Sequence, residues 1–271
     1  MKLSLCTISY RHHLRSLPNI ASFATSNGFD SLELWGIHAK NLNPLCDPSK
    51  LNGIKISMIS DYLPLDGNLS DLYKKTDELI ALAEKWETSR IRTFASTKGS
   101  ESVLPAERKE ITGRLRDICT RLPEGQKLLI ETHPGTLADT LDSTLKLIEE
   151  VRHPAFHINF DVLHVWESGV DPIEAFNQLE PYIDHLHLKN IANRSLLHVF
   201  NPANVYAAAG SREGMVPLFE GAVDYTHFFE QLGSRLDSLT GSLEWFGPDP
   251  DTVLKHDSQL IQNAGKLMSV K

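Results

Sequence analysis

Short β-rich runs alternate with longer helical segments along almost the whole chain. Eight such runs predict strands: Lys2–Ser9, Ser31–Trp35, Lys55–Ser60, Arg90–Ala95, Lys127–Thr132, His157–Val162, Ile183–Lys189 and Ser242–Phe246. The segments between them carry apolar residues every three or four positions, as in the stretch from Leu69 to Trp86. Strands that alternate with helices form parallel βαβ units, whose right-handed connections allow a sheet to close on itself. The pattern therefore predicts an α/β fold, a (β/α)₈ TIM barrel.

A doubly wound open sheet is the alternative fold for the same alternation. Such a sheet usually has a glycine-rich turn after its first strand, and residues Ser9–Leu14 contain no glycine. A length of 271 residues suits one α/β barrel, so we expect residues 1–271 to form a single domain. The segment 191–223 is long and irregular, yet rich in apolar and aromatic side chains. We expect this segment to be a lid or a subunit contact, the latter in a homo-oligomer.

The charge balance and the apolar runs argue against two kinds of partner. Lys and Arg number 27 against 35 Asp and Glu, a formal net charge of −8, which disfavours binding along a nucleic-acid backbone. No apolar run approaches the ~18 residues that span a bilayer, and the run Arg11–His13 comes too early for a signal-peptide core. The cysteines, Cys6, Cys46 and Cys119, are odd in number and lack C-x-x-C spacing. We therefore expect a cytoplasmic protein with no nucleic-acid or membrane partner and no disulfide framework.

Acidic and histidine side chains gather where the last four predicted strands end. There the chain reads Leu129-Ile130-Glu131-Thr132-His133, Asn159-Phe160-Asp161, His185-Leu186-His187-Leu188-Lys189 and Leu243-Glu244-Trp245. In barrel enzymes the catalytic groups project from the C-terminal ends of strands. Because side chains alternate along a strand, Glu131 and His133 share one face, and so do His187 and Lys189. Polar groups at such inward positions are costly unless something pairs with them.

Four of these side chains on adjacent strands have the character of metal ligands: Glu131, Asp161, His187 and Glu244. A purely structural network of ion pairs is the alternative, but the matching phase of the four strand ends favours a metal site. An oxygen-rich set with a single imidazole suits Mn²⁺ or Mg²⁺ better than a structural zinc. The sequence thus predicts one divalent cation, and Lys189 would be stabilised by the negative charge that remains around it.

Three further polar residues allow two interpretations each. Arg92 could anchor a carboxylate or phosphate through its fork, or form a salt bridge to a barrel glutamate such as Glu33. Tyr62 could donate a hydrogen bond to a substrate or cap its strand. His164, three residues after Asp161, could support that residue or lie on the surface.

Several segments resemble one enzyme family. They are Ser4–Ser9, Glu33–Gly36, Met58–Leu63, Ile91–Ala95, Glu131–Pro134, Trp166–Gly169, Asn204–Gly210, Gly214–Gly221 and Ser242–Gly247. Together they resemble the 3-dehydroshikimate dehydratases of catechol-siderophore (petrobactin-type) biosynthesis, within the xylose isomerase-like, or sugar-phosphate isomerase, TIM-barrel superfamily. The strand-end carboxylates alone indicate only the superfamily, whereas the motifs within the long segment 191–223 are specific to the narrower family.

The resemblance implies dehydration of 3-dehydroshikimate to 3,4-dihydroxybenzoate (protocatechuate) through a metal-stabilised enolate. It carries over the metal ligands Glu131, Asp161, His187 and Glu244, the catalytic pair His133 and Lys189, and the substrate-binding residues Tyr62, Arg92 and Phe246. His133 is the expected base. Lys189 would stabilise the enolate or protonate the departing hydroxyl, and the sequence leaves these two roles open. The product could enter siderophore biosynthesis or quinate and shikimate catabolism.

Other functions of the same barrel remain as alternatives. A sugar or sugar-phosphate isomerase or epimerase would use the same enolate chemistry without elimination. A barrel kept as a binding module would not need four inward polar ligands. A DNA-repair endonuclease of the superfamily would need more metal-binding histidines and a basic face, against the net charge of −8.

Overall fold

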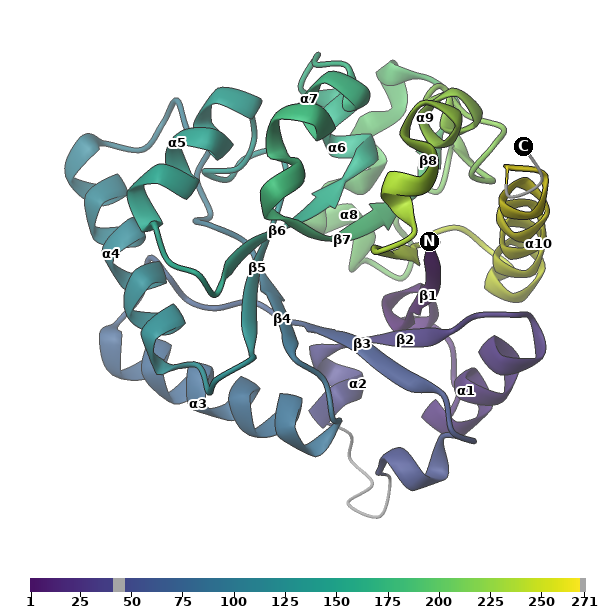
Figure 1. Ribbon diagram of the computed structural model, residues 1–271, viewed down its shortest axis with the longest axis horizontal. Helices are drawn as coiled ribbons and strands as arrows, with labels where there is room; N and C mark the ends of the chain where they lie inside the picture. The colour runs from purple at the N-terminus through teal and green to yellow at the C-terminus, as the bar shows by residue number, and fades with distance from the viewer. Residues whose placement is uncertain (41–46, 269–271) are drawn as a thin grey trace.

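The computed structural model describes residues 1–40 and 47–268, with side chains described as far as residue 263. Within this part of the chain, eight parallel strands close a barrel in the order β1-β10-β7-β6-β5-β4-β3-β2 (Figure 1). Their bounds are β1 Lys2–Cys6, β2 Ser31–Trp35, β3 Lys55–Ser60, β4 Arg90–Thr93, β5 Lys127–Glu131, β6 Phe156–Asp161, β7 Ile183–Leu188 and β10 Thr240–Leu243. The predicted barrel is confirmed.

Helices surround the barrel on its outside (Figure 1). They are α1 Leu17–Ser26, α2 Gly36–Lys40, α3 Leu69–Lys85, α4 Pro105–Arg121, α5 Leu141–Val151, α6 Val162–Glu167, α7 Pro172–Leu179, α9 Tyr225–Leu232 and α10 Pro250–Met268. Helix α3 buries Leu72 and Leu79 against the barrel, and Trp86 is buried directly after its last residue. Leu69, expected on the same stripe, is 45% exposed because it lies in the first turn of α3, at the edge of the packed layer.

Short 3₁₀ helices complete the connections: η1 Thr7–Tyr10, η2 Pro48–Lys50, η3 Glu180–Tyr182, η4 Arg194–Phe200 and η5 Gly233–Leu236. The first of them shortens the first predicted strand. Within η1, the Thr7 hydroxyl accepts a hydrogen bond from the Trp35 backbone N–H at 2.9 Å. The Ser9 hydroxyl accepts one from Trp245 N–H at 3.0 Å. The residues that follow β1 therefore cap two other strands instead of extending the sheet.

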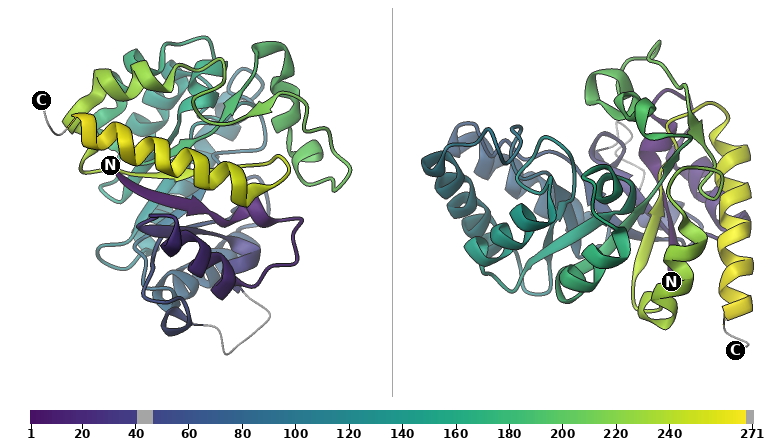
Figure 2. Two further views of the ribbon diagram at one scale, coloured as in Figure 1. Left: turned by 90° about the vertical axis from the view of Figure 1, so that its right-hand side faces the viewer. Right: turned by 90° about the horizontal axis from the view of Figure 1, so that it is seen from above.

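Helix α10 was not predicted from the sequence. It runs along the outside of the barrel beside the end of α1 (Figure 2). The Tyr10 hydroxyl donates to Asp251 Oδ1 at 2.7 Å, and the Ser258 hydroxyl donates to the Asn27 carbonyl at 3.1 Å. The helix thus fastens the C-terminal part of the chain to the first βα unit.

The segment 191–223 is more ordered than expected. It contains η4, the short helix α8 (Pro202–Val205) and strand β9 (Met215–Val216), which pairs antiparallel with β8 (Asn190–Ile191). Asn190 fixes the base of the segment, because its amide donates to the Leu218 and Val223 carbonyls at 2.7 and 2.8 Å. Buried side chains such as Val199 and Leu218 hold the segment against the barrel.

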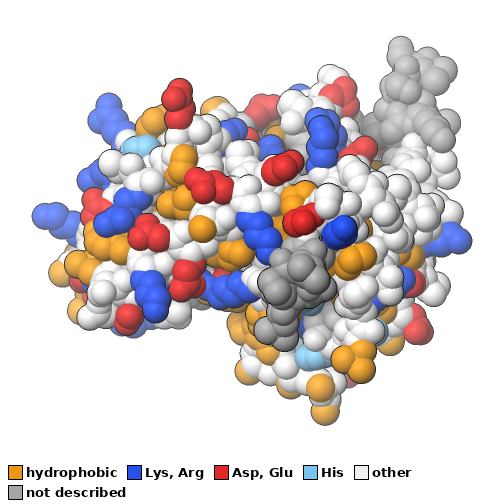
Figure 3. Space-filling view, turned by 90° about the horizontal axis from the view of Figure 1, so that it is seen from below, with side chains coloured by type: hydrophobic (Ala, Val, Ile, Leu, Met, Phe, Trp, Pro, Cys, Tyr) orange, Lys and Arg blue, Asp and Glu red, His pale blue; other side chains and the backbone are white. Residues whose placement is uncertain are grey.

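The surface is mixed in charge. On the face in Figure 3, Lys and Arg side chains are interspersed with Asp and Glu side chains. In the part of the chain that the structure describes, no helix is long and apolar enough to cross a membrane. Cys6 and Cys119 are buried and free, and Cys46 lies outside the described residues.

Candidate active site

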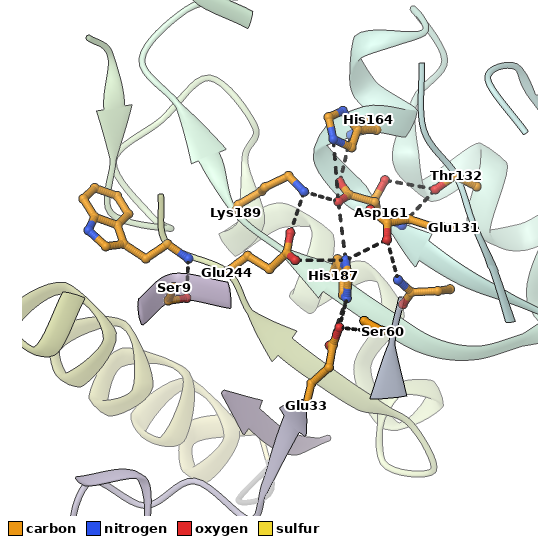
Figure 4. A network of polar contacts seen from close by, with 12 residues as sticks. Ser9, Glu33, Ser60, Glu131, Thr132, Asp161, His164, His187, Lys189 and Glu244 are labelled. Carbon is orange, nitrogen blue, oxygen red and sulfur yellow. Dashed lines mark hydrogen bonds and ion pairs between the residues drawn. The ribbon is translucent and has the colours of Figure 1, made fainter. Parts of the chain in front are cut away.

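Four predicted ligands meet at the C-terminal end of the barrel (Figure 4). Glu131 and Asp161 end β5 and β6, His187 is the fifth residue of β7, and Glu244 follows β10. These strands are consecutive neighbours in the barrel, so their ends bring the four side chains together. One ligand-type atom from each residue lies within 4.8 Å of the others, and all four residues are buried.

The imidazole of His187 faces the three carboxylates. Its Nδ1 lies 3.4 Å from Glu131 Oε2, 3.6 Å from Glu244 Oε1 and 3.9 Å from Asp161 Oδ2. Among the described residues this buried nitrogen has no hydrogen-bond partner. Burial alone would lower the pKa of His187, but the surrounding carboxylates outweigh it and raise the pKa well above its ordinary value. The donor set fits a divalent cation, because three acceptor groups and one unpaired nitrogen converge on one point.

The charges of the site lead to the same conclusion. Its fully or almost fully buried carboxylates are Glu33, Glu131, Asp161 and Glu244, and its basic side chains are Arg92 and Lys189. When His187 is neutral, as a metal ligand must be, two negative charges remain after each basic side chain offsets one carboxylate. One divalent cation would neutralise them. Charges buried without such compensation are strongly unfavourable.

Lys189 bridges two of the predicted ligands. Its Nζ lies 2.5 Å from Asp161 Oδ2 and 2.7 Å from Glu244 Oε2. Burial would lower the pKa of Lys189, but these two carboxylates prevail and raise it well above the ordinary value. The residue is therefore an ammonium ion, and two of its three N–H groups are engaged.

Arg92 combines parts of both interpretations. It forms a buried ion pair, with Nε 2.9 Å from Glu131 Oε2. The expected salt bridge to a barrel glutamate is present, but the partner is Glu131 on the neighbouring strand β5 and not the suggested Glu33 on β2. In the described part of the chain, Arg92 Nε and Nη1 are both buried and neither makes a hydrogen bond, so the contact of Nε with Glu131 is an ion pair only. The guanidinium lies over the ring of Phe94, 5.0 Å from its centroid.

His133 is a neutral imidazole with a defined tautomer. Its Nδ1 lies 2.7 Å from the Pro134 carbonyl, which can only accept, so Nδ1 carries the proton and Nε2 carries the lone pair. Its ring packs between Phe94 and His164, with centroid distances of 4.5 and 4.4 Å. Burial, together with nearby His164, lowers the pKa of His133 to about 3. At neutral pH this side chain is therefore unprotonated.

These groups share one cavity. A narrow inner chamber of about 40 Å³ is lined by Tyr62, Arg92, Glu131, His133, Lys189, Glu244 and Phe246, among others. It adjoins an outer cavity of about 580 Å³, and Tyr62, His133 and Phe200 line both. The predicted ligands Asp161 and His187 lie directly behind this lining, in contact with Lys189 and Glu131. The structure thus brings all nine predicted site residues together.

The segment 191–223 contributes walls that sequence reasoning did not assign. Phe200, Pro202 and Tyr206 line both parts of the cavity. The Tyr206 hydroxyl is hydrogen-bonded to the Tyr62 hydroxyl across the opening, and the Tyr206 ring stacks on Trp35. No periodic pattern could have found Tyr206, because it lies outside the barrel strands.

Comparison with known proteins identifies the family. The family model for xylose isomerase-like TIM barrels matches residues 23–264. A 3-dehydroshikimate dehydratase of Bacillus anthracis is 47% identical over 274 residues, which cover 97% of each chain. The chain belongs to the 3-dehydroshikimate dehydratase family. A crystal structure from B. anthracis, described as the probable 3-DHS dehydratase AsbF involved in petrobactin synthesis, matches with a TM-score of 0.92 and 46% identity. The match covers 97% of this chain and 99% of that one.

More remote relatives share less with this dehydratase family. An inosose dehydratase of Geobacillus kaustophilus is 27% identical over 119 residues, 44% of this chain and 38% of the relative. L-ribulose 3-epimerase matches with a TM-score of 0.74 at 16% identity, over 99% of this chain and 96% of that one, so the similarity is one of fold alone. The isomerase or epimerase alternative is therefore supported only by a distant fold relative.

Proposed function

We propose that this protein dehydrates 3-dehydroshikimate to 3,4-dihydroxybenzoate with one divalent cation. The observation that carries the proposal is a single cavity in which a neutral imidazole, an ammonium ion and an unpaired guanidinium N–H surround a buried cluster of metal-ligand type. The near full-length similarity to a 3-dehydroshikimate dehydratase supports the same substrate.

Glu131, Asp161, His187 and Glu244 would hold the cation. Their oxygen-rich donor set favours Mn²⁺ or Mg²⁺. When bound, such a cation supplies Lewis acidity that stabilises negative charge developing on a substrate oxygen. Glu244 also accepts a hydrogen bond from Lys189, so this carboxylate links the cation site to the reacting groups.

The ring ketone of the substrate makes the proton on the neighbouring carbon acidic. His133 Nε2 accepts this proton, because Nδ1 is already committed to the Pro134 carbonyl. The third N–H of Lys189 is available to the substrate, where it stabilises the enolate oxygen or protonates the departing hydroxyl. Loss of water and a second proton loss make the ring aromatic, so the reaction is effectively irreversible.

The remaining contacts position the substrate. Arg92 Nη1 would donate to the substrate carboxylate, the Tyr62 hydroxyl would hydrogen-bond a ring substituent, and Phe246 would pack against the ring. The segment 191–223 would act as the lid through Tyr206, or as a contact in a homo-oligomer.

We further propose a single cytoplasmic domain that acts on a small molecule and has no nucleic-acid partner. The involvement of the B. anthracis relative in petrobactin synthesis favours siderophore biosynthesis over quinate and shikimate catabolism as the use of the product.

The test is a direct assay. Metal-free protein is incubated with 3-dehydroshikimate, with and without added Mn²⁺ or Mg²⁺, while the ultraviolet absorbance of a catechol is followed. Product should form only when the cation is restored. Epimerisation of the substrate without any catechol signal would support the epimerase alternative. Product formation by rigorously metal-free protein would contradict the requirement for a divalent cation.

A further inference from the structure

A buried acid lies behind the cation cluster, on the far side of the His187 ring (Figure 4). It is Glu33, the third residue of β2, which is completely buried. Its oxygens Oε2 and Oε1 lie 2.9 and 3.0 Å from His187 Nε2. Strands β2 and β7 are not neighbours in the barrel, so this contact crosses the barrel interior.

This contact assigns the two nitrogens of His187. A carboxylate accepts hydrogen bonds, so Nε2 carries the hydrogen that lies on Glu33. In the neutral ring Nδ1 then carries the lone pair, and Nδ1 is the nitrogen that faces Glu131, Asp161 and Glu244. Either a proton on Nδ1 or a metal cation can occupy the space between Nδ1 and these carboxylates. In both cases the Nε2 hydrogen stays with Glu33.

Glu33 is itself held in place. The Ser60 hydroxyl of β3 donates to Glu33 Oε1. His185 Nε2 lies 3.5 Å from Glu33 Oε2 and is hydrogen-bonded to the Ser242 hydroxyl at 2.7 Å. All these side chains are buried, so the orientation of Glu33 is determined by partners on β3 and β7.

We propose that Glu33 is a positioning residue that makes His187 bind the divalent cation through Nδ1. The inference rests on the proposed cation site and adds the residue that orients one of its ligands. A carboxylate on the far nitrogen of a ligating histidine fixes its tautomer and ring orientation, and loss of such a partner typically weakens metal binding by about 10- to 100-fold.

Two substitutions separate position from charge. Glu33→Asp keeps the charge but is one methylene shorter, so it cannot make the same contact with Nε2. Glu33→Gln keeps the length and an accepting oxygen but removes the charge. The dissociation constant of Mn²⁺ is measured by titration calorimetry on metal-free protein at fixed pH. If Glu33 acts by position, Glu33→Asp should bind Mn²⁺ about 10- to 100-fold more weakly than the wild type.

A spectroscopic readout reports the nitrogen itself. In ¹⁵N-histidine-labelled protein titrated with Mg²⁺, the Nδ1 resonance of His187 should move while Nε2 stays protonated. His187→Gln identifies the resonance by its disappearance. In Glu33→Gln the Nε2–H tautomer should persist, and in Glu33→Asp a mixture of tautomers should appear.

Ser60→Ala is a second variant that leaves Glu33 in place and removes only the hydroxyl on Oε1. It should weaken Mn²⁺ binding in the same direction as Glu33→Asp, and it tests the inference even if substitutions of Glu33 prevent folding.

The outcomes distinguish this inference from the one on which it rests. A wild-type protein that binds no Mn²⁺ would overturn the cation site and the role of Glu33 together. Wild-type binding with an unchanged dissociation constant in Glu33→Asp and Ser60→Ala would overturn the role of Glu33 alone, as would Mg²⁺-dependent movement of Nε2 instead of Nδ1.

Discussion

Replacing Arg92 with lysine tests whether this residue anchors the substrate carboxylate. The guanidinium pairs with Glu131 through Nε and, among the described residues, leaves Nη1 without a partner. A lysine ammonium can keep a positive charge beside Glu131, but it cannot reproduce a second, fixed donor. The variant should therefore lose one charge-assisted hydrogen bond to substrate, worth about 1.5–3 kcal/mol. At 1.36 kcal/mol per decade, kcat/KM should fall by about 10- to 150-fold.

The assay is the appearance of catechol absorbance under saturating Mn²⁺. A 3-dehydroshikimate analogue with a carboxamide in place of the carboxylate completes the comparison. The wild type should discriminate strongly against the amide, and Arg92→Lys should discriminate much less, because the contact that senses the carboxylate is gone.

A neighbouring arginine provides the control. Arg90, two residues earlier in β4, pairs with Asp184 at 2.5 Å near the other end of the strand. Arg90→Lys should leave kcat/KM close to the wild-type value. If kcat/KM is unchanged in Arg92→Lys, or falls equally for the carboxylate substrate and the carboxamide analogue, Arg92 does not anchor the carboxylate. Its role would then be only the structural pairing with Glu131.

Three other predictions follow from the site and from one buried acid. Glu244→Ala should lose most bound Mn²⁺, measured by calorimetry, and nearly all activity; full occupancy at the wild-type rate would contradict the four-ligand site. His133→Ala and Lys189→Ala should keep the cation and lose about 10²–10⁴ in kcat each, with a smaller combined loss than the product of the two. If His133→Ala still exchanges the substrate proton with solvent at the normal rate, the base is another residue. Burial raises the pKa of Asp257 from 3.8 to about 6, so the folded state holds this proton more tightly than the unfolded state. The resulting stabilisation is complete below pH 3.8 and is lost as the pH rises through 6, a change of about 3 kcal/mol. We therefore expect the free energy of unfolding of Asp257→Asn, measured in urea, to rise by about 3 kcal/mol relative to that of the wild type between pH 3 and pH 7.5. A difference between the two proteins that does not change with pH would contradict this.

Most of the barrel could be predicted because its strands are short, apolar and separated by amphipathic helices. Ser31–Trp35 and Lys55–Ser60 match β2 and β3 residue for residue. The ends of strands were less predictable where side chains take up the hydrogen bonds of the sheet. In η1, for example, Thr7 and Ser9 cap other strands, and this depends on partners 28 and 236 residues away.

The ligand cluster was predictable for a different reason. Side-chain alternation fixes which residues at a strand end point inward, so Glu131 and His187 could be placed on the same side as the cavity. Their partners could not be derived in this way, because alternation says nothing about which strands meet. The contact of Glu33 with His187 crosses the barrel, and the contact of Tyr206 with Tyr62 depends on a segment outside the sheet.

The pairing of charges within the cavity bears on the choice between an acid and a sugar as substrate. Lys189 is held by Asp161 and Glu244, and the Nε side of Arg92 is held by Glu131. Among the described residues, Arg92 Nη1 is then a buried charged donor that still lacks an acceptor. A substrate carboxylate satisfies it, whereas a neutral ketose that leaves it unpaired incurs the cost of an unsatisfied charged group. The unpaired edge of Arg92 therefore favours dehydroshikimate over a sugar in this barrel.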